Sequence, residues 1–241
     1  GTTNDKITLL RDKYDAWLNI GTLTGIDKTD LTITMTGADE LASDLTSTTG
    51  QITFSKLGAD YSNLLGQKVK VMFKNGNTNE VIGVYATDDN TVVTAYKNEI
   101  DTESGKIVIG NNSYSLDTKG VKTIVDGVVQ SSNWNAVDFK SSTSPDVVTL
   151  IDSDSDSKLD TVVIKTVDVQ KVTYVSASQI IAGSKTYKFA DDTIPADVAK
   201  DDWVIITKDL YNDNNLLTVA DKATGAVEAT KTSSAGYEQY Q

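Results

Sequence analysis

The residues best suited to chemistry lie in one acidic stretch, residues 152–160, which reads DSDSDSKLD. Its carboxylates stand at relative positions 1, 3, 5 and 9 and belong to Asp152, Asp154, Asp156 and Asp160. In a calcium loop of this spacing, alternate oxygens converge on one cation, and the backbone carbonyl at position 7, here that of Lys158, adds a ligand. Because like charges repel, a bound cation is the simplest way to hold them in a tight turn. The spacing predicts a weak calcium site.

Two departures keep a plain acidic turn open as the alternative. Ser157 stands at position 6, where the sharp turn favours glycine. Val163 stands at position 12, so the bidentate glutamate of an EF-hand is missing. Elsewhere in the chain the equivalent turns are Asn-rich, at residues 75–77 and 212–215, which favours a solvated turn.

Composition excludes several chemistries. The 241 residues include no histidine and no cysteine, so thiolates, imidazole bases, zinc fingers and Ser-His-Asp triads are excluded. Any metal site must use oxygen ligands and take a hard cation such as calcium or magnesium. A net charge of −12 argues against nucleic acid as a partner. No apolar run reaches the roughly 18 residues that span a bilayer. We expect a protein that is not an enzyme.

Two other groups of side chains are weaker candidates. The acidic pairs at residues 88–89, 191–192 and 201–202 stand beside Asn or Lys, and turn formation explains them. Trp134 stands in a polar loop, where an exposed indole would stack against a sugar. Trp17 and Trp203 lie in apolar segments, and we expect both to pack in the core.

One helix and many strands should position these residues. Apolar residues at three- and four-residue steps predict an amphipathic helix over residues 5–19, with Asn4 and Gly21 as its caps. Short helical turns are expected near residues 60–65 and 197–200. Period-two alternation then predicts strands. The first of these strands are residues 31–35, 51–54, 69–74, 80–87, 91–97, 106–109 and 113–116.

An internal repeat organises the strands. Segments that begin at Val69, Val147 and Trp203 each read as strand, polar turn, strand, short turn, strand. In the first two copies a hairpin with a central glycine follows, at residues 107–116 and 180–189. The expected fold class is therefore mainly β, with tandem small antiparallel β-barrel or sandwich modules and one short N-terminal amphipathic helix.

Four units follow from the repeat. They are an N-terminal helix and first hairpin module (1–66), repeat 1 (67–118), repeat 2 with the Asp-rich loop (119–192) and an incomplete repeat 3 (193–241). The third copy stops where its hairpin should start. Either the chain is a piece of a longer one, or a neighbouring chain completes an open sheet edge.

Several segments resemble one family over nearly the whole chain. They are residues 15–24, 61–71, 84–90, 144–152 and 171–175. They are similar to the region that follows the anchoring repeats in S-layer homology (SLH) domain proteins of Gram-positive bacteria. The resemblance implies an extracellular cell-surface or cell-wall location and assembly into a surface layer. The SLH repeats of that family bind secondary cell-wall polymer, and this sequence contains no recognisable copy of them.

The leading hypothesis is a non-enzymatic bacterial cell-surface structural protein that self-associates into a sheet or filament with the help of calcium. Contact with cell-wall polymer would run through an anchor region absent from this sequence. One alternative is a carbohydrate- or surface-binding module of an adhesin or secreted hydrolase, acting through Trp134. A phage fibre domain fits the β-rich composition as well.

Overall fold

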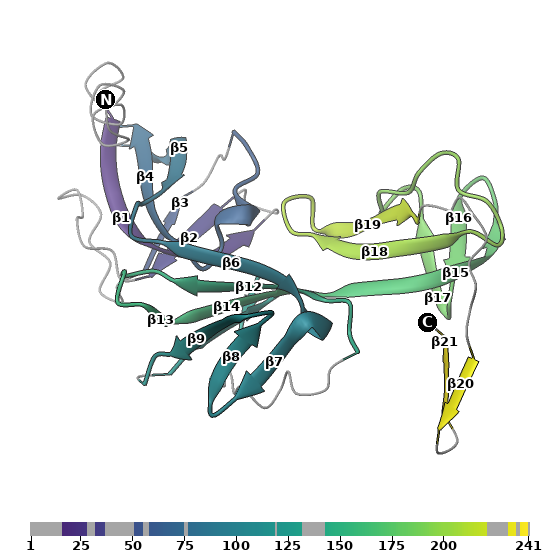
Figure 1. Cartoon of the computed structure of the whole chain (residues 1–241). Helices are drawn as coiled ribbons and strands as arrows, with labels where there is room; N and C mark the ends of the chain where they lie inside the picture. The colour runs from purple at the N-terminus through teal and green to yellow at the C-terminus, as the bar shows by residue number, and fades with distance from the viewer. Residues whose placement is uncertain are drawn as a thin grey trace.

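The computed structural model describes residues 16–27, 32–36, 51–54, 58–74, 77–118, 120–131, 143–220, 231–234 and 237–240. In this part of the chain the fold is mainly β, with several sheets and two short 3-10 turns, at Ser62–Leu64 and Lys97–Glu99 (Figure 1). The turn at Ser62–Leu64 confirms the short helical turn expected near residues 60–65. Among these described residues, no helix has the length and apolar character needed to cross a membrane.

The first sheet has five strands in the order β3-β2-β1-β4-β5. Their bounds are β1 Ala16–Asp27, β2 Thr32–Thr36, β3 Gln51–Phe54, β4 Lys68–Lys74 and β5 Asn77–Ala86. Alternation in β4 turns Val69 and Val71 inward, where they are fully buried with Leu23 of β1. A core of its own therefore holds this sheet together.

The helix predicted over residues 5–19 is not supported. Residues 1–15 lie outside the described residues, and Ala16 already belongs to β1, where it pairs with Lys74 of β4. Gly21, the predicted helix cap, pairs with Val69 in the same ladder. Pairing with β4 satisfies the backbone along this segment and buries Leu23, so tertiary context overrides the local helical spacing.

The middle sheet has the order β11-β10-β14-β12-β6 and adjoins a four-stranded sheet, β13-β9-β8-β7. The bounds are β6 Thr91–Tyr96, β7 Ile100–Glu103, β8 Lys106–Ile109, β9 Asn112–Leu116, β10 Lys122–Val125, β11 Val128–Val129, β12 Val147–Asp152, β13 Lys158–Leu159 and β14 Thr161–Lys165. Ile107 and Val121 share one core with Leu150 and Val162. Two pairs, β10–β14 and β13–β9, are parallel, whereas the sequence predicts antiparallel pairing throughout.

The last sheet has the order β17-β16-β15-β18-β19 and encloses a third core around Val172, Val204 and Leu217. The bounds are β15 Val167–Val175, β16 Gln179–Ala182, β17 Lys185–Lys188, β18 Trp203–Asp209 and β19 Asn214–Val219. A separate hairpin joins β20 Lys231–Ser234 to β21 Tyr237–Tyr240. Residues 197–200, where a helical turn is predicted, contain turn positions at 197 and 200 and no helix.

The three five-stranded sheets share one pairing pattern. In each, one strand pairs antiparallel with the first strand of a later hairpin, as β1 does with β4, β6 with β12 and β15 with β18. The strands thus group differently from the four predicted units. The boundary predicted after residue 66 separates β3 from β4, and that after residue 192 separates β17 from β18, although each pair belongs to one sheet. The boundary after residue 118 divides the core that Ile107 and Val121 share.

Polar side chains clamp the junctions between successive sheets. Between β5 and β6, the Asn90 amide accepts a hydrogen bond from Lys68 N and donates one to Lys68 O, each 2.8 Å long. Between β14 and β15 only Thr166 intervenes, and Asp126 accepts its N–H at 3.0 Å and its hydroxyl at 2.6 Å. Asp146 accepts Val167 N at 2.8 Å. These bonds order the connections because they replace the ladder bonds that a turn lacks.

Close packing joins the first sheet to the middle one. A Cβ on Gly66 would lie 2.8 Å from Thr161 Cγ2 and Val163 Cγ2 and 2.9 Å from Ile151 Cδ1. Gly66 also has φ +81, a conformation that side-chain-bearing residues rarely adopt. Leu210 and Tyr211, which follow β18, pack against the same first core, so three sheets meet at this place.

The substitution Gly66→Ala tests this packing. The methyl group meets β12 and β14, and the backbone is strained, so we expect the free energy of unfolding to fall by about 2–4 kcal/mol. Gly105→Ala is the matched control, because Gly105 has φ +79 and nothing within 4 Å of its Cβ. It should lose only the backbone cost of about 1 kcal/mol. Equal losses for the two variants in urea unfolding would contradict the close junction.

Candidate metal centre

The Asp-rich loop connects β12 to β13 at one end of the middle sheet. Asp152 is the last residue of β12 and is 5% exposed, whereas Asp154 and Asp156 lie in the loop and are exposed. The strand buries Asp152 because Ile151 and Leu150 before it are fully buried. The centre therefore has one carboxylate anchored in the fold and two that face solvent.

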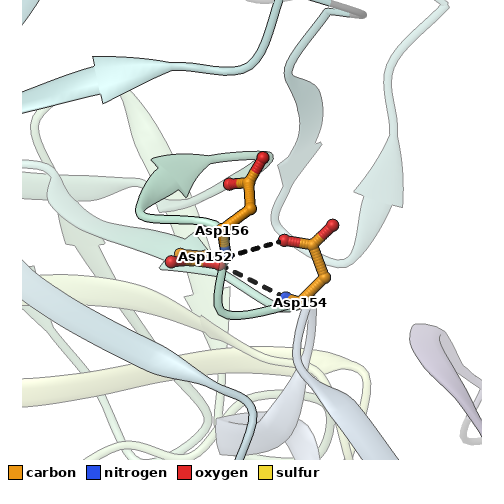
Figure 2. Close-up of side chains that lie close together, drawn as sticks. All are labelled: Asp152, Asp154 and Asp156. Atoms are coloured by element: carbon orange, nitrogen blue, oxygen red, sulfur yellow. Dashed lines mark hydrogen bonds between the residues drawn. The ribbon is translucent and has the colours of Figure 1, made fainter.

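Successive backbone N–H groups curl the loop around its own carboxylates. Asp152 accepts Asp154 N at 3.3 Å and Ser157 N at 2.8 Å. Asp154 accepts Asp156 N at 3.2 Å, and Asp156 accepts Lys158 N at 2.8 Å. Figure 2 shows these carboxylates arranged around the turn. Each Asp thus closes a local turn on the residue two positions ahead, as Asp side chains commonly do.

The backbone has the sharp turn that the calcium-loop pattern requires. Ser157, at the position where glycine is expected, has φ 67, and Ser155 has φ 64. Non-glycine residues adopt this left-handed conformation at a cost of about 1–3 kcal/mol. The loop therefore keeps the shape associated with glycine although serine occupies the position.

Three carboxylates come together, and the fourth does not join them. One oxygen from each of Asp152, Asp154 and Asp156 lies within 4.8 Å of the other two. Asp160 lies outside this group. Its Oδ2 accepts Ser153 N and Ser153 Oγ, both at 2.7 Å, and its Oδ1 accepts Thr161 Oγ1 at 2.7 Å. Asp160 therefore closes the base of the loop.

Charge in the loop is only partly balanced. Lys158 Nζ lies 3.4 Å from Asp156 Oδ2, and both side chains are over a third exposed, so this ion pair contributes little. Two carboxylates about 4 Å apart in water repel by about 1 kcal/mol. Attraction of the carboxylates to a divalent cation would outweigh their mutual repulsion, and their oxygen ligands suit calcium or magnesium. Lys158, whose backbone carbonyl is the predicted fifth ligand, donates its backbone N–H to Asp156 within the loop.

The loop also touches the junction between the first and middle sheets, which the sequence did not indicate. Ser155 Oγ donates to Asp89 O at 2.9 Å, across the turn that joins β5 to β6. Asp89 Oδ2 in turn pairs with Lys68 Nζ at 3.1 Å. A cation in the loop would therefore fix not only the loop but also its contact with this junction.

Of the three tryptophans, Trp203 lies differently from the sequence prediction. Trp134, the predicted sugar-stacking residue, lies outside the described residues, and so does the side chain of Trp17. Trp203, predicted to be a core residue, is 53% exposed, whereas its neighbour Val204 is fully buried. The alternation along β18 places adjacent residues on opposite faces, so a buried Val204 requires an outward Trp203.

The acidic pairs act in turns, as predicted. Asp192 Oδ1 accepts Asn215 N at 3.1 Å and Asn215 Nδ2 at 2.7 Å. Asp202 Oδ2 accepts Ala199 N at 2.9 Å. The hydrogen bond and charge of Lys171, 2.8 Å away, lower the pKa of Asp201.

A cavity of about 370 Å³ lies where the three sheets meet. Its lining includes Leu65, Val163 and Leu210, with Asp126, Lys208 and Asp209 among its polar residues. Burial raises the pKa of Asp209, but hydrogen bonds from the Asn212 side chain and backbone hold it below its ordinary value overall. Asp209 is therefore a charged structural acceptor, unsuited to act as a general acid near neutral pH.

Comparisons of the chain with protein-family models, with curated proteins and with solved structures find no match. The Asp152–Asp154–Asp156 group is the candidate metal centre on its geometry and ligand chemistry. Its features are one buried carboxylate, two exposed ones and a turn in the left-handed conformation.

The variant Asp154→Ala tests the centre. With calcium at ten times the dissociation constant, binding should stabilise the parent chain by about 1.4 kcal/mol and raise its Tm by about 3–5 °C. The variant should lose this increment and keep the Tm of the parent in chelator. Asp197→Ala, at another exposed aspartate, is the control and should respond to calcium as the parent does. An equal loss of Tm with calcium and with chelator would reject the site.

Proposed function

We propose that this chain is a non-enzymatic structural component of a bacterial cell surface that self-associates through its β modules. The observation that carries the proposal is the set of closely packed junctions. Thr166 alone separates β14 from β15, and Gly66 seats the first sheet directly on β12 and β14. Chains that need flexible reach use Gly- or Ser-rich linkers. Asn90, Asp126 and Asp146 instead fix the connections between sheets by hydrogen bonds. Such fixed connections suit a structural component whose modules keep one orientation in an assembly.

Tandem small β-barrel or sandwich modules are the architecture that we infer for it. Support comes from the three separate cores and from the shared pairing of β1–β4, β6–β12 and β15–β18. In the first sheet, β3 also contacts β5, which brings the two ends of the strand order together. Such closure protects sheet edges.

Calcium has a defined place in this proposal. The Asp152–Asp154–Asp156 group contacts the β5–β6 turn through Ser155 and Asp89. A cation there would neutralise the loop and stiffen the junction between the first and middle sheets. Calcium at extracellular millimolar levels suffices for such weak loops.

The experiment is negative-stain electron microscopy of the purified chain in calcium and in chelator. We expect ordered sheets or filaments in calcium and smaller species in chelator, because the cation stiffens the first junction. Asp154→Ala should resemble the chelator sample in both conditions, and Asp197→Ala should behave as the parent. Discrete particles of one size in both conditions would contradict the proposal.

Carbohydrate binding is the second candidate, and the exposure of Trp203 favours it. Trp203 pairs with Lys171, and the outward face of the same sheet carries Val169, which is 40% exposed. An exposed indole on a sheet face can stack on a sugar ring.

The variant Trp203→Ala separates the two functions. If the face binds sugar, saturable binding to a glycan array disappears in Trp203→Ala while the Tm changes by less than about 2 °C, because the side chain is half exposed. Tyr174→Ala, which removes an exposed aromatic side chain from the neighbouring strand β15, is the control. Absence of saturable glycan binding by the parent chain would remove this candidate.

A further inference from the structure

Most sheet edges in the described part of the chain are guarded against pairing with another strand. Exposed Lys185 and Lys188 guard β17, and exposed Asp101 and Glu103 guard β7. Thr193 covers β19 through two backbone hydrogen bonds. The edge strand β11 has only two residues. Charge, cover and short length are the usual means by which sheet edges avoid pairing.

The edge of β6 is covered only at its C-terminal end, where the Glu99 side chain accepts Tyr96 N at 3.0 Å. This strand reads TVVTAY, six residues without a charge, and in the described part of the chain it pairs only with β12 on one side. Val92 is 41% exposed, Tyr96 is 55% exposed, and Thr94 between them is also exposed. β-branched and aromatic residues favour strand pairing. The middle sheet therefore ends in an uncharged, pairing-competent strand.

The hydrogen bonds show which residues of β6 face the free edge. Tyr96 N donates to the Glu99 side chain at 3.0 Å, so this N–H points away from the ladder with β12. Backbone groups alternate along an antiparallel strand. Thr94 and Val92 therefore direct their N–H and C=O groups to the same free edge as Tyr96.

We infer that β6 is a self-association interface, where it pairs antiparallel with β6 of a second copy about a two-fold axis at Thr94. In this register Thr94 faces the partner's Thr94, and Val92 faces the partner's Tyr96. Those pairs join the residues whose N–H and C=O groups point outward, and Tyr96 N exchanges its exposed Glu99 acceptor for a carbonyl of the partner. Aromatic–β-branched pairs across strands are favourable. This inference rests on the proposed function, since it names the surface through which the chain self-associates.

Charge identifies a second copy as the occupant. An isologous interface places the residues on its two-fold axis beside their own counterparts, so a charge at the axis would meet a like charge. The chain carries a net charge of −12, yet none of its 34 acidic residues lies in β6. A basic partner would instead call for acidic residues along the strand. The neutral strand in an acidic chain fits a copy of itself.

Single-cysteine crosslinking tests the register, and the chain has no cysteine of its own. In the pairing described, the two copies of residue 94 have Cα atoms about 5.5 Å apart, within disulfide range. Residue 91 is also exposed, but its two copies would lie about 20 Å apart along the strand. In calcium under mild oxidation, Thr94→Cys should yield covalent dimer about tenfold faster than Thr91→Cys.

A charged variant gives a second measurement. Thr94→Lys places two like charges at the axis and should lower the association constant by about tenfold in sedimentation equilibrium. Thr218→Lys, at an exposed residue of β19, should leave the constant unchanged. Both variants should change the Tm by less than about 2 °C, since both side chains are exposed and Thr94→Lys loses only the 3.4 Å hydroxyl contact with Thr149.

The outcomes separate this inference from the proposed function. Equal crosslinking at positions 91 and 94 in a chain that associates would overturn the β6 interface and leave self-assembly standing. A parent chain that stays monomeric in calcium at all concentrations would overturn both.

Discussion

Antiparallel pairing of one strand with the first strand of a later hairpin is the interaction on which this structure depends. It occurs between β1 and β4, β6 and β12, and β15 and β18. Each pairing joins the two strands by backbone hydrogen bonds along the side where they meet, and each lies beside its own apolar core. Short connections carry the chain from one sheet to the next: residues 87–90 lie between β5 and β6, and Thr166 alone lies between β14 and β15. Gly66, Asn90 and Asp126 are then required at the junctions.

The positions of many strands could be predicted from local sequence pattern. Which face of a strand is buried, and which strands share a sheet, could not. Strands 51–54 and 106–109 match β3 and β8, because β-branched alternation is a local property. Alternation also shows that Trp203 and Val204 face opposite ways, but it does not say which way the core lies. The role of Gly66 depends on Ile151 and Thr161, which only the fold brings near it. The predicted helix was wrong from Ala16 onward for the same reason, since β4 is distant in sequence.

The sequence predicted the residue types of the candidate metal centre, but only three of its four predicted aspartates come together. Spacing identified Asp152, Asp154 and Asp156, which the structure gathers. Asp160 fits the same spacing, yet Ser153 and Thr161 bind its carboxylate and draw it to the base of the loop. Because Ser155 reaches Asp89, the loop and the first junction form one unit. The charge of the Asp-rich loop is therefore linked to the junction between the first and middle sheets. Through this link, weak calcium binding would influence assembly.

The central claim is that rigidly joined β modules self-associate and that calcium promotes this association. Sedimentation velocity over a concentration series, in calcium and in chelator, tests it most directly. The account predicts a weight-average sedimentation coefficient that rises with protein concentration, and more steeply in calcium. A single coefficient, independent of concentration and of calcium, would contradict it.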